Sequence, residues 1–228
     1  VRAIADAVPN MKHVYSVDEQ GKPQIKKFNR VNMGLAVDVD KGKGQRSLVV
    51  PVLRNADTLD FAGFLLTYED IIRKVRANKL TLDDFQGANV SLTNPGTIGT
   101  QMSVPRLMAG QGLIVGVGTI DYPAEFQGSD ERALGRLGVS KVVTITSTYD
   151  HRIIQGAESG MFLKYVHELL TGEHNFYADV FSSLGVPYES VKWRDDSNSL
   201  DSEDALLEKQ MQIATLIRVH RVRGHLIA

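Results

Sequence analysis

The stretch Lys141-Val-Val-Thr-Ile-Thr-Ser-Thr-Tyr149 runs directly into Asp150-His151-Arg152-Ile-Ile-Gln155-Gly156. The first segment alternates between two sets of side chains, which is the pattern of a β-strand. Apolar residues at helical spacing follow from Ala157 to Thr171, and Gly172 is placed to end that helix. The sequence therefore predicts a strand, a short turn and a helix, with the densest polar cluster of the chain in the turn.

Strands and helices alternate along the chain before this stretch. Apolar residues at every second position from Val31 to Val39 predict a half-buried strand. Spacings of three and four after Thr58 predict an amphipathic helix, capped by Thr58 or Asp60. The fold class is therefore α/β, a mixed sheet with helices in a two-layer α+β arrangement. Further strands are expected at 47–53, 89–93 and 113–118, and loops at 40–46 and 121–138.

The character of the sequence changes after Gly172. Residues 173–199 contain few periodic apolar positions, which is typical of a linker. A helix is expected from Asp201, because acidic residues at its start and arginines near its end match the helix dipole. We expect a domain at 1–172 whose N-terminal part is missing, a linker at 173–199 and a helix at 200–228. The apolar face of this last helix is expected to consist of Leu206, Ile213, Leu216 and Ile217.

Composition excludes several classes of protein. The chain has 228 residues and no cysteine, which excludes a disulfide framework, a thiolate zinc site and a cysteine nucleophile. Its 26 Lys and Arg balance 27 Asp and Glu, so its net charge attracts neither nucleic acid nor an anionic membrane. We expect no nucleic-acid partner, no membrane partner and no metal site.

The sequence also lacks the patterns of membrane insertion or export. No apolar run approaches the roughly 20 residues of a membrane span, and the first residues show no signal-peptide pattern. We expect a cytoplasmic protein, and because the sequence starts at Val1 without methionine, we expect it to begin partway through a longer chain.

His151 is the first candidate for catalysis. It lies between Asp150 and Arg152 where a rigid strand ends, and side chains in such a place reach a cleft. An imidazole with an ordinary pKa near 6.5 can act as a general base at neutral pH. The alternative is a structural histidine, which is the commoner case for an isolated His.

Thr93 is the second candidate, within Ser91-Leu-Thr-Asn-Pro-Gly-Thr-Ile-Gly99. The turn at Pro95-Gly96 is expected to expose its hydroxyl. On these residues alone the alternative is favoured, in which the hydroxyls bond to their own backbone.

Other motifs are weaker. No Gly-x-Ser-x-Gly elbow occurs, which disfavours a serine hydrolase of that kind. Gly116-Val-Gly118 opens no helix, as a dinucleotide loop would require. The Gly- and Lys-rich residues 40–46 suit a solvated turn better than a phosphate site.

Several blocks in order resemble the catalytic domain of the dihydrolipoyl acyltransferases of the 2-oxo acid dehydrogenase complexes. The resemblance covers roughly residues 1–172 and implies a coenzyme A-dependent fold like that of chloramphenicol acetyltransferase. The blocks are Val31-Asn-Met-Gly-Leu-Ala-Val37, Leu48-Val-Val-Pro-Val-Leu-Arg54, Lys79-Leu-Thr-Leu-Asp-Asp84, Ser91-Leu-Thr-Asn94, Met102-Ser-Val-Pro105 and Asp150-His151-Arg152-x-x-x-Gly156.

The tail carries a second resemblance. Glu208-Lys-Gln and Ile217-Arg-Val-His-Arg-Val-Arg-Gly-His-Leu-Ile-Ala228 are similar to the beginning of a thiamine-dependent 2-oxoglutarate dehydrogenase or decarboxylase. Such a fusion resembles the actinobacterial multifunctional 2-oxoglutarate enzymes, which implies that the acyl group is succinyl. The resemblance places thiamine diphosphate and magnesium only in the decarboxylase part, beyond Ala228.

The resemblance also implies roles for the site residues. An acyl group passes between a dihydrolipoyl thiol and coenzyme A, with His151 as the base and Thr93 donating a hydrogen bond to the oxyanion. The enzyme is not acylated, which agrees with the absence of cysteine. The position four after the histidine is usually Asp or Asn in this family and is Gln155 here. Residues implied to support the site are Asn94, Asp150, Arg152, Gln155 and Gly156.

The resemblance further implies a trimer with active sites between subunits, a lipoyl domain of a partner acyltransferase, and the dihydrolipoyl dehydrogenase complex. Residues that contact coenzyme A are not assigned. Two alternatives stay open. One is an acetyltransferase of the same fold acting on a hydroxyl acceptor. The other is an oligomeric scaffold whose transferase site is degenerate, which Gln155 favours.

Overall fold

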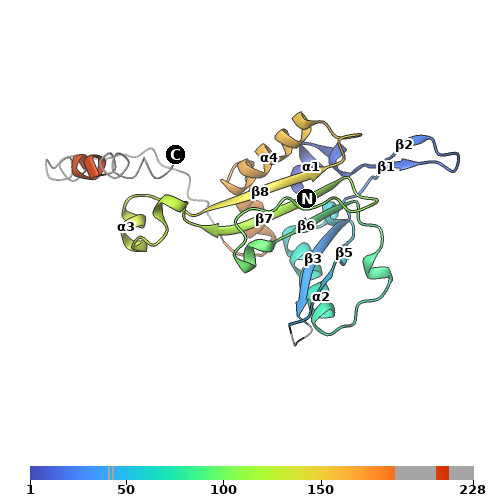
Figure 1. The fold of residues 1–228 in the computed structure, drawn as a ribbon, viewed down its shortest axis with the longest axis horizontal. Helices are drawn as coiled ribbons and strands as arrows, with labels where there is room; N and C mark the ends of the chain where they lie inside the picture. The colour runs from blue at the N-terminus through green and yellow to red at the C-terminus, as the bar shows by residue number, and fades with distance from the viewer. Residues whose placement is uncertain (41, 43, 188–208, 216–228) are drawn as a thin grey trace. The chain divides into compact units, whose positions relative to one another are not determined.

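The computed structural model describes residues 1–40, 42, 44–187 and 209–215 (Figure 1). The chain divides into two units, Val1–Ser190 and Val191–Ala228. The first unit contains the sheet and the helices discussed below. In the second, the described residues 209–215 are helical, and their side chains are exposed.

A mixed sheet organises the first unit. Its strands follow the order β4-β3-β6-β7-β8, and β5 also pairs with β3. Strands β3, β6 and β7 are parallel, β4 and β5 are antiparallel to β3, and β8 is antiparallel to β7. The predicted mixed sheet is confirmed. The strands are β3 (Met33–Asp40), β4 (Arg46–Val49), β5 (Val52–Leu53), β6 (Val90–Thr93), β7 (Leu113–Asp121) and β8 (Val142–Tyr149).

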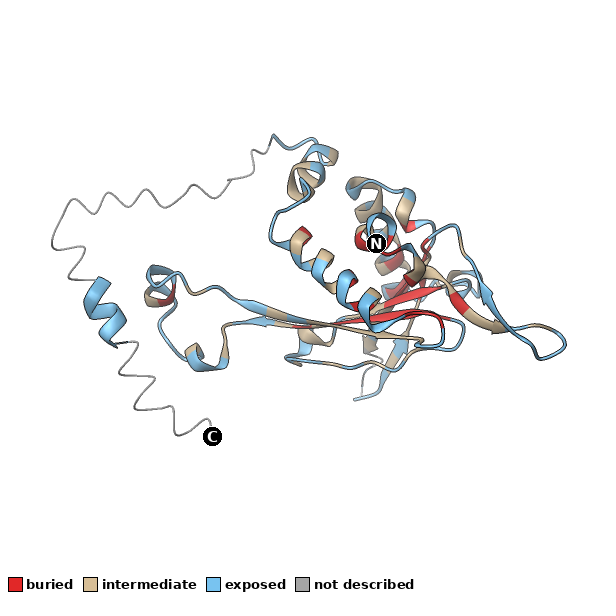
Figure 2. Ribbon diagram, turned by 90° about the horizontal axis from the view of Figure 1, so that it is seen from above, coloured by how far each residue is buried: buried red, intermediate tan, exposed pale blue. Residues whose placement is uncertain are grey.

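Most of the α-helices gather along one side of this sheet, with the buried residues concentrated between the two layers (Figure 2), whereas α3 (Glu131–Arg136) lies beyond the ends of β7 and β8 (Figure 1). A separate hairpin, β1 (Val14–Val17) with β2 (Pro23–Lys26), extends away from the sheet (Figure 1). The α-helices are α1 (Arg2–Asp6), α2 (Phe61–Arg76), α3 (Glu131–Arg136), α4 (Gly156–Leu170) and α5 (Phe176–Ser183). The 3-10 helices are η1 (Pro9–Lys12), η2 (Ala56–Thr58), η3 (Asp83–Phe85), η4 (Pro95–Ile98) and η5 (Ala124–Phe126).

Strand β3 and helix α2 form one part of the core. The predicted alternation is confirmed, because Met33 and Leu35 are buried and pack with Ile71 and Val75 of α2. Of the two predicted caps for this helix, the structure selects Asp60, whose carboxylate accepts a hydrogen bond of 2.8 Å from the Gly63 N–H.

Strand β8 and helix α4 form the other part and lie close to their predicted bounds. Ile154, buried completely in the turn between them, shares a cluster with Phe162 of α4 and Leu113 of β7. The Ser147 and Ser159 hydroxyl oxygens lie 2.5 Å apart and join the strand to the helix. The turn that carries His151 is therefore bounded by two packed elements.

The expected strand at 47–53 is divided into two. Strand β4 ends at Val49, and β5 begins at Val52. Pro51 lacks the N–H that a continuous ladder needs, although its carbonyl still accepts a 2.8 Å bond from the Leu35 N–H. Both parts pair with β3, so the predicted hairpin around residues 40–46 is confirmed by its flanking strands.

The expectation of a loop throughout residues 121–138 is wrong, because helix α3 lies within it. Asp130 caps this helix by accepting a 2.9 Å bond from the Ala133 N–H, and Leu134 is buried. One buried residue in so short a helix leaves no periodic pattern. The cap and that single buried contact account for the helix instead.

Residues 173–199 also differ from the expected linker, since helix α5 occupies Phe176–Ser183 and lies against α2. Residues 188–199 lie outside the described residues, so the domain boundary at 172 stays a prediction.

Of the four residues expected to form the apolar face of the C-terminal helix, only Ile213 is described, and its side chain is 57% exposed. Leu206, Leu216 and Ile217 lie outside the described residues.

Within the described part of the chain, no helix is both long enough and apolar enough to cross a membrane.

The segment after β6 lies directly against β7, and two glycines permit that approach. A Cβ on Gly118 would lie 1.9 Å from the Gln101 carbonyl oxygen. A Cβ on Gly96 would lie 2.2 Å from the Gly118 backbone. These contacts are with backbone atoms, so a side chain at either position must displace the segment. Gly118 therefore serves packing rather than a dinucleotide loop.

We predict that Gly118→Ala lowers the free energy of unfolding by about 1–3 kcal/mol, because it overpacks β7 against residues 99–105. Gly160→Ala is the matched control, since its Cβ meets nothing within 4 Å and alanine favours the helix by up to about 1 kcal/mol. Urea unfolding of both variants checks this. Equal stability of the two variants would contradict the packing role of Gly118.

Candidate active site

The turn after β8 is fixed by its first residue and by two buried ones. The Asp150 N–H donates to the Gly112 carbonyl over 3.0 Å, and the Asp150 carbonyl accepts from Ile153 and Ile154. Ile153 and Ile154 are buried in the core. His151 lies between these anchors and is exposed. The structure thus holds the backbone of His151 while leaving its imidazole accessible.

Asp150 and Arg152 pair with each other. The Arg152 guanidinium donates to both carboxylate oxygens of Asp150, over 2.8 and 2.6 Å. It lies 3.5 Å from the ring centroid of Tyr15, in the β1–β2 hairpin. The hydrogen bonds from Arg152 lower the pKa of the Asp150 carboxyl below its ordinary value. Asp150 therefore remains ionised near neutral pH, and both of its carboxylate oxygens are hydrogen-bonded to Arg152.

His151 has a different environment from its neighbours. Its ring centroid lies 5.6 Å from that of Tyr149, in a tilted arrangement. Among the described residues, no hydrogen bond to the His151 ring is found. The charges on either side of His151 thus support the turn rather than orient the imidazole directly.

Gln155 and Gly156 begin helix α4. Gln155 is the N-cap, and its N–H donates over 2.7 Å to the carboxylate of Glu158. A Cβ on Gly156 would make only an ordinary 3.6 Å contact with the Tyr149 hydroxyl. Glu158, which was not among the expected residues, supports the turn through its bond to the Gln155 N–H. The Gln-x-x-Glu spacing before an apolar helix was the signal for it, because it fits a capping box.

Thr93 and Asn94 lie where β6 ends and η4 begins. Thr93 is half-buried, and its backbone is paired with Ala36 on one side and Gly116 on the other. Asn94 is exposed, and its carbonyl accepts a 3.2 Å bond from the Thr97 hydroxyl. Ser91, by contrast, is buried within the sheet. Of the hydroxyls in this stretch, Thr93 is therefore better placed than Ser91 to meet a substrate.

The sheet keeps His151 and Thr93 apart within one chain. Thr93 pairs with Gly116 of β7, whereas Tyr149 pairs with Leu113, three residues earlier on the same strand. Three residues of strand span about 10 Å, and two strand spacings add about 10 Å across the sheet. Thr93 and Tyr149 are thus separated by roughly 14 Å, and His151 lies past Tyr149 at the far end.

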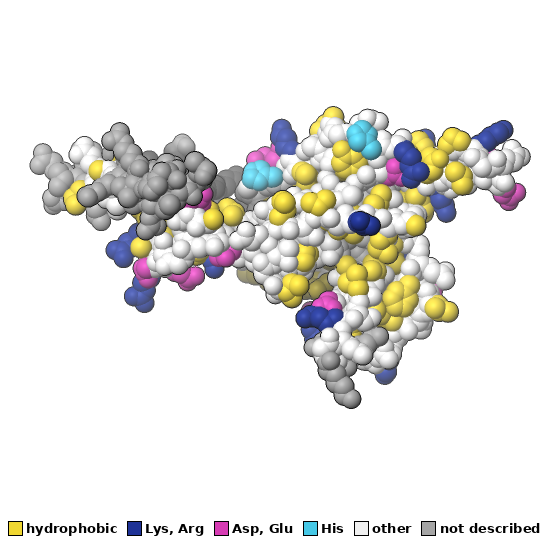
Figure 3. Space-filling model, in the orientation of Figure 1, with side chains coloured by type: hydrophobic (Ala, Val, Ile, Leu, Met, Phe, Trp, Pro, Cys, Tyr) yellow, Lys and Arg dark blue, Asp and Glu magenta, His cyan; other side chains and the backbone are white. Residues whose placement is uncertain are grey.

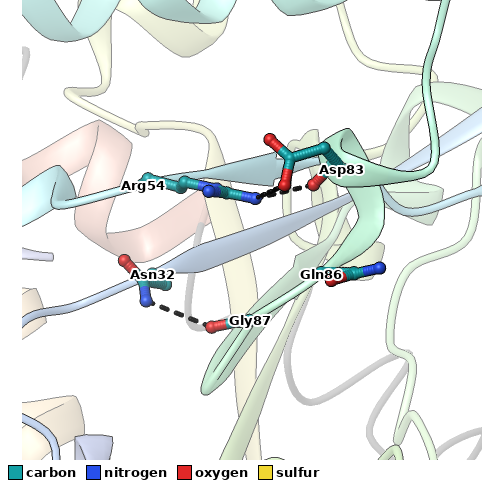
Figure 4. Close-up of a pocket in the computed structure, with 5 residues that line it drawn as sticks. All are labelled: Asn32, Arg54, Asp83, Gln86 and Gly87. Carbon is teal, nitrogen blue, oxygen red and sulfur yellow. Dashed lines mark hydrogen bonds and ion pairs between the residues drawn. The ribbon is translucent and has the colours of Figure 1, made fainter.

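Two hollows in the first unit contain neither residue. A groove of about 690 Å³ is bounded by α1, α2, α5 and β3. A smaller hollow of about 310 Å³ lies beside Arg54, which donates to the Asp83 carbonyl and carboxylate over 2.7 and 2.8 Å (Figure 4). Asn32 donates to the Gly87 carbonyl in the same hollow. The polar groups there largely satisfy one another.

One group of side chains has metal-ligand character. Potential ligand atoms of Glu168, Glu173 and His174 lie within 4.8 Å of one another. His174 contacts Glu168 over 2.9 Å and stacks on Tyr165, and its hydrogen bond lowers the pKa of Glu168. The hydrogen bond between His174 and Glu168 and the stacking on Tyr165 account for this cluster as packing at the end of α4.

Comparisons with known proteins agree with this architecture. The family model for the 2-oxoacid dehydrogenases acyltransferase (catalytic domain) matches residues 1–177. Solved structures with a similar fold include dihydrolipoamide acetyltransferase from Azotobacter vinelandii, at TM-score 0.58 and 25% identity over 77% of this chain and 67% of that one. A probable dihydrolipoamide acetyltransferase from Listeria monocytogenes gives 0.57 and 20% over 85% and 70%.

Curated relatives are more similar in sequence. The multifunctional 2-oxoglutarate metabolism enzyme of Mycobacterium sp. (strain JLS) is 51% identical over 96% of this chain and 17% of its own length. That of Mycolicibacterium vanbaalenii is 50% identical over 99% of this chain and 18% of its own length. The chain thus spans less than a fifth of these proteins. With its mixed sheet and its match over residues 1–177, it belongs to the catalytic-domain family of the 2-oxoacid dehydrogenase acyltransferases.

Proposed function

We propose that this chain transfers a succinyl group between dihydrolipoyl groups and coenzyme A. The observation that carries the proposal is the exposed His151 on a turn fixed by Asp150 and the core, in a chain of this acyltransferase family. The succinyl group is inferred from relatives named for 2-oxoglutarate metabolism.

His151 is proposed as the general base. A thiol has a pKa near 8.5, and an imidazole can act as the general base that accepts its proton as the sulfur attacks the thioester carbonyl. The tetrahedral intermediate then expels the other thiolate, which takes the proton back from His151. No cysteine of the enzyme is needed, because both sulfur atoms belong to the substrates.

Thr93 is proposed as the oxyanion donor. Its hydroxyl would donate a hydrogen bond to the oxygen that becomes negative in the intermediate. Such donors are worth about 2.7–4 kcal/mol in transition-state stabilisation. Asn94 follows at the start of η4 and would help to hold this end of β6.

The separation of the two residues supports a shared site. Because β7 lies between β6 and β8, and β6 and β8 run in opposite directions, Thr93 and His151 do not meet at a single carbonyl group within one chain. We therefore propose a trimer in which His151 of one chain serves the site that contains Thr93 of its neighbour. One of the similar solved structures is the cubic core of the pyruvate dehydrogenase multienzyme complex, which is consistent with assembly.

A non-catalytic scaffold is the second candidate, and Gln155 is the observation that favours it. The solved structure from A. vinelandii was determined to examine the catalytic roles of a serine, a histidine and an asparagine. That asparagine lies four positions after the histidine. The corresponding position here is Gln155, which caps α4. Its amide retains donor and acceptor groups, so a supporting role is still chemically available.

The longer protein is proposed to be a cytoplasmic 2-oxoglutarate dehydrogenase or decarboxylase. In that proposal thiamine diphosphate and magnesium bind in the decarboxylase part, outside residues 1–228. The acyl-lipoyl substrate comes from the lipoyl domain of a partner acyltransferase, and the dihydrolipoyl dehydrogenase complex is the further partner.

We predict that the protein transfers succinyl from succinyl-coenzyme A to dihydrolipoamide, and that His151→Ala lowers kcat about 10²–10⁴-fold because the base is lost. His167→Ala is the control, since His167 is another exposed histidine at the end of α4. Thioester formation checks both variants. Absence of transfer by the unmodified protein contradicts the enzyme proposal and favours the scaffold. Substantial residual transfer by His151→Ala contradicts the assignment of the base.

Thr93→Val tests the oxyanion role with little change in side-chain shape. We predict that kcat falls about 10²–10³-fold, while the Kd for coenzyme A changes little. Thr93→Ser keeps the hydroxyl and should retain much of the activity. A large rise in Kd with kcat preserved would show that Thr93 binds substrate instead.

A further inference from the structure

Asn10 reaches the His151 turn from a distant part of the chain. It belongs to η1, and its side-chain amide donates to the Ile153 carbonyl over 3.0 Å across a separation of 143 residues. The same nitrogen donates to a carboxylate oxygen of Glu158 over 2.9 Å. An Asn amide nitrogen has two hydrogens, so both are used at this turn.

Glu158 extends the connection to the start of α4. Its second carboxylate oxygen accepts the 2.7 Å bond from the Gln155 N–H. Asn10 therefore spans the last part of the turn, from the Ile153 carbonyl through Glu158 to the N-cap. Bonds to a carboxylate are shorter and stronger than neutral ones. We name these three contacts of Asn10 and Glu158 the Asn10 bridge.

The turn is held at its two ends by different contacts. At the first end, Asp150 is fixed by Gly112 and Arg152. At the second end, the Asn10 bridge holds Ile153 and the N-cap. Since no hydrogen bond to the His151 ring is found among the described residues, the position of the imidazole depends on this backbone.

We propose that Asn10 is a positioning residue, which acts through Glu158 and the turn to place His151 for proton transfer. This inference rests on the proposed acyl transfer. Asn10 is half-buried and does not itself meet the reacting atoms in the proposal.

The packing of η1 separates this role from folding. Val8 and Met11, on either side of Asn10, are buried and share the core cluster that contains Ile153 and Ile154. Apolar contacts therefore hold η1 against the turn without the amide of Asn10. Loss of the bridge should loosen the turn while leaving the core folded.

Asn10→Asp is the sharpest test, because it keeps the side-chain shape, removes both donors and places a carboxylate beside Glu158. We predict a fall in kcat of about 10- to 100-fold with KM within about threefold, since small misplacement of a catalytic group has effects of this size. Asn29→Asp is the matched control. It makes the same charge change at an exposed position, and it should preserve kcat. Glu158→Gln should reproduce the Asn10→Asp effect.

Two further measurements distinguish positioning from damage to the fold. In a His151→Ala background, Asn10→Asp should lower the residual kcat no further, because the effect passes through His151. Hydrogen–deuterium exchange of Asn10→Asp should rise in the peptide covering 150–160 and stay unchanged in β7. An additional loss of kcat in the His151→Ala background, or unchanged exchange in that peptide, would overturn the inference. If the unmodified protein transfers no acyl group, the proposed function fails, while exchange still decides whether the bridge holds the turn.

Discussion

The pairing of β7 with its neighbours determines what this chain can do alone. Because β6 is parallel to β7 and β8 is antiparallel, the ends of β6 and β8 that carry Thr93 and His151 point in opposite directions. The register of a buried sheet cannot slip by one residue without exposing its apolar side chains. The separation is therefore built into the fold, and it is the reason why the proposed reaction, which uses both groups, involves a second copy of the chain.

The contacts around His151 and around Thr93 suit the role proposed for each residue. At the His151 end, Asp150 and the Asn10 bridge fix the backbone while the imidazole stays exposed. At the Thr93 end, Gly96 and Gly118 let the following segment lie against β7. Rigid backbone with an accessible reactive atom is the arrangement that preorganised catalysis needs.

Most of the fold could be predicted from local patterns. Strand β8 and helix α4 have clear periodicities, and their bounds differ from the prediction by one residue. Features with short or nonlocal causes could not be found in this way. Helix α3 depends on the Asp130 cap and one buried leucine, and the break between β4 and β5 depends on the N–H that Pro51 lacks, which apolar periodicity does not register. For the site, the sequence suggested that Asp150 and Arg152 flank His151 as neighbouring charges. It did not show that they pair with each other, or that Asn10 contacts the turn from 143 residues away.

The shared site is the central claim, and mixed assemblies test it most directly. Chains carrying His151→Ala and chains carrying Thr93→Val are co-expressed with different tags, and assemblies that contain both are purified and assayed for succinyl transfer. If each site takes His151 from one chain and Thr93 from its neighbour, about one of the three sites is intact in each trimer that contains both variants. Activity should then recover to a comparable fraction of that of the unmodified protein. Mixed assemblies no more active than the two variants assayed separately would contradict a site shared between chains.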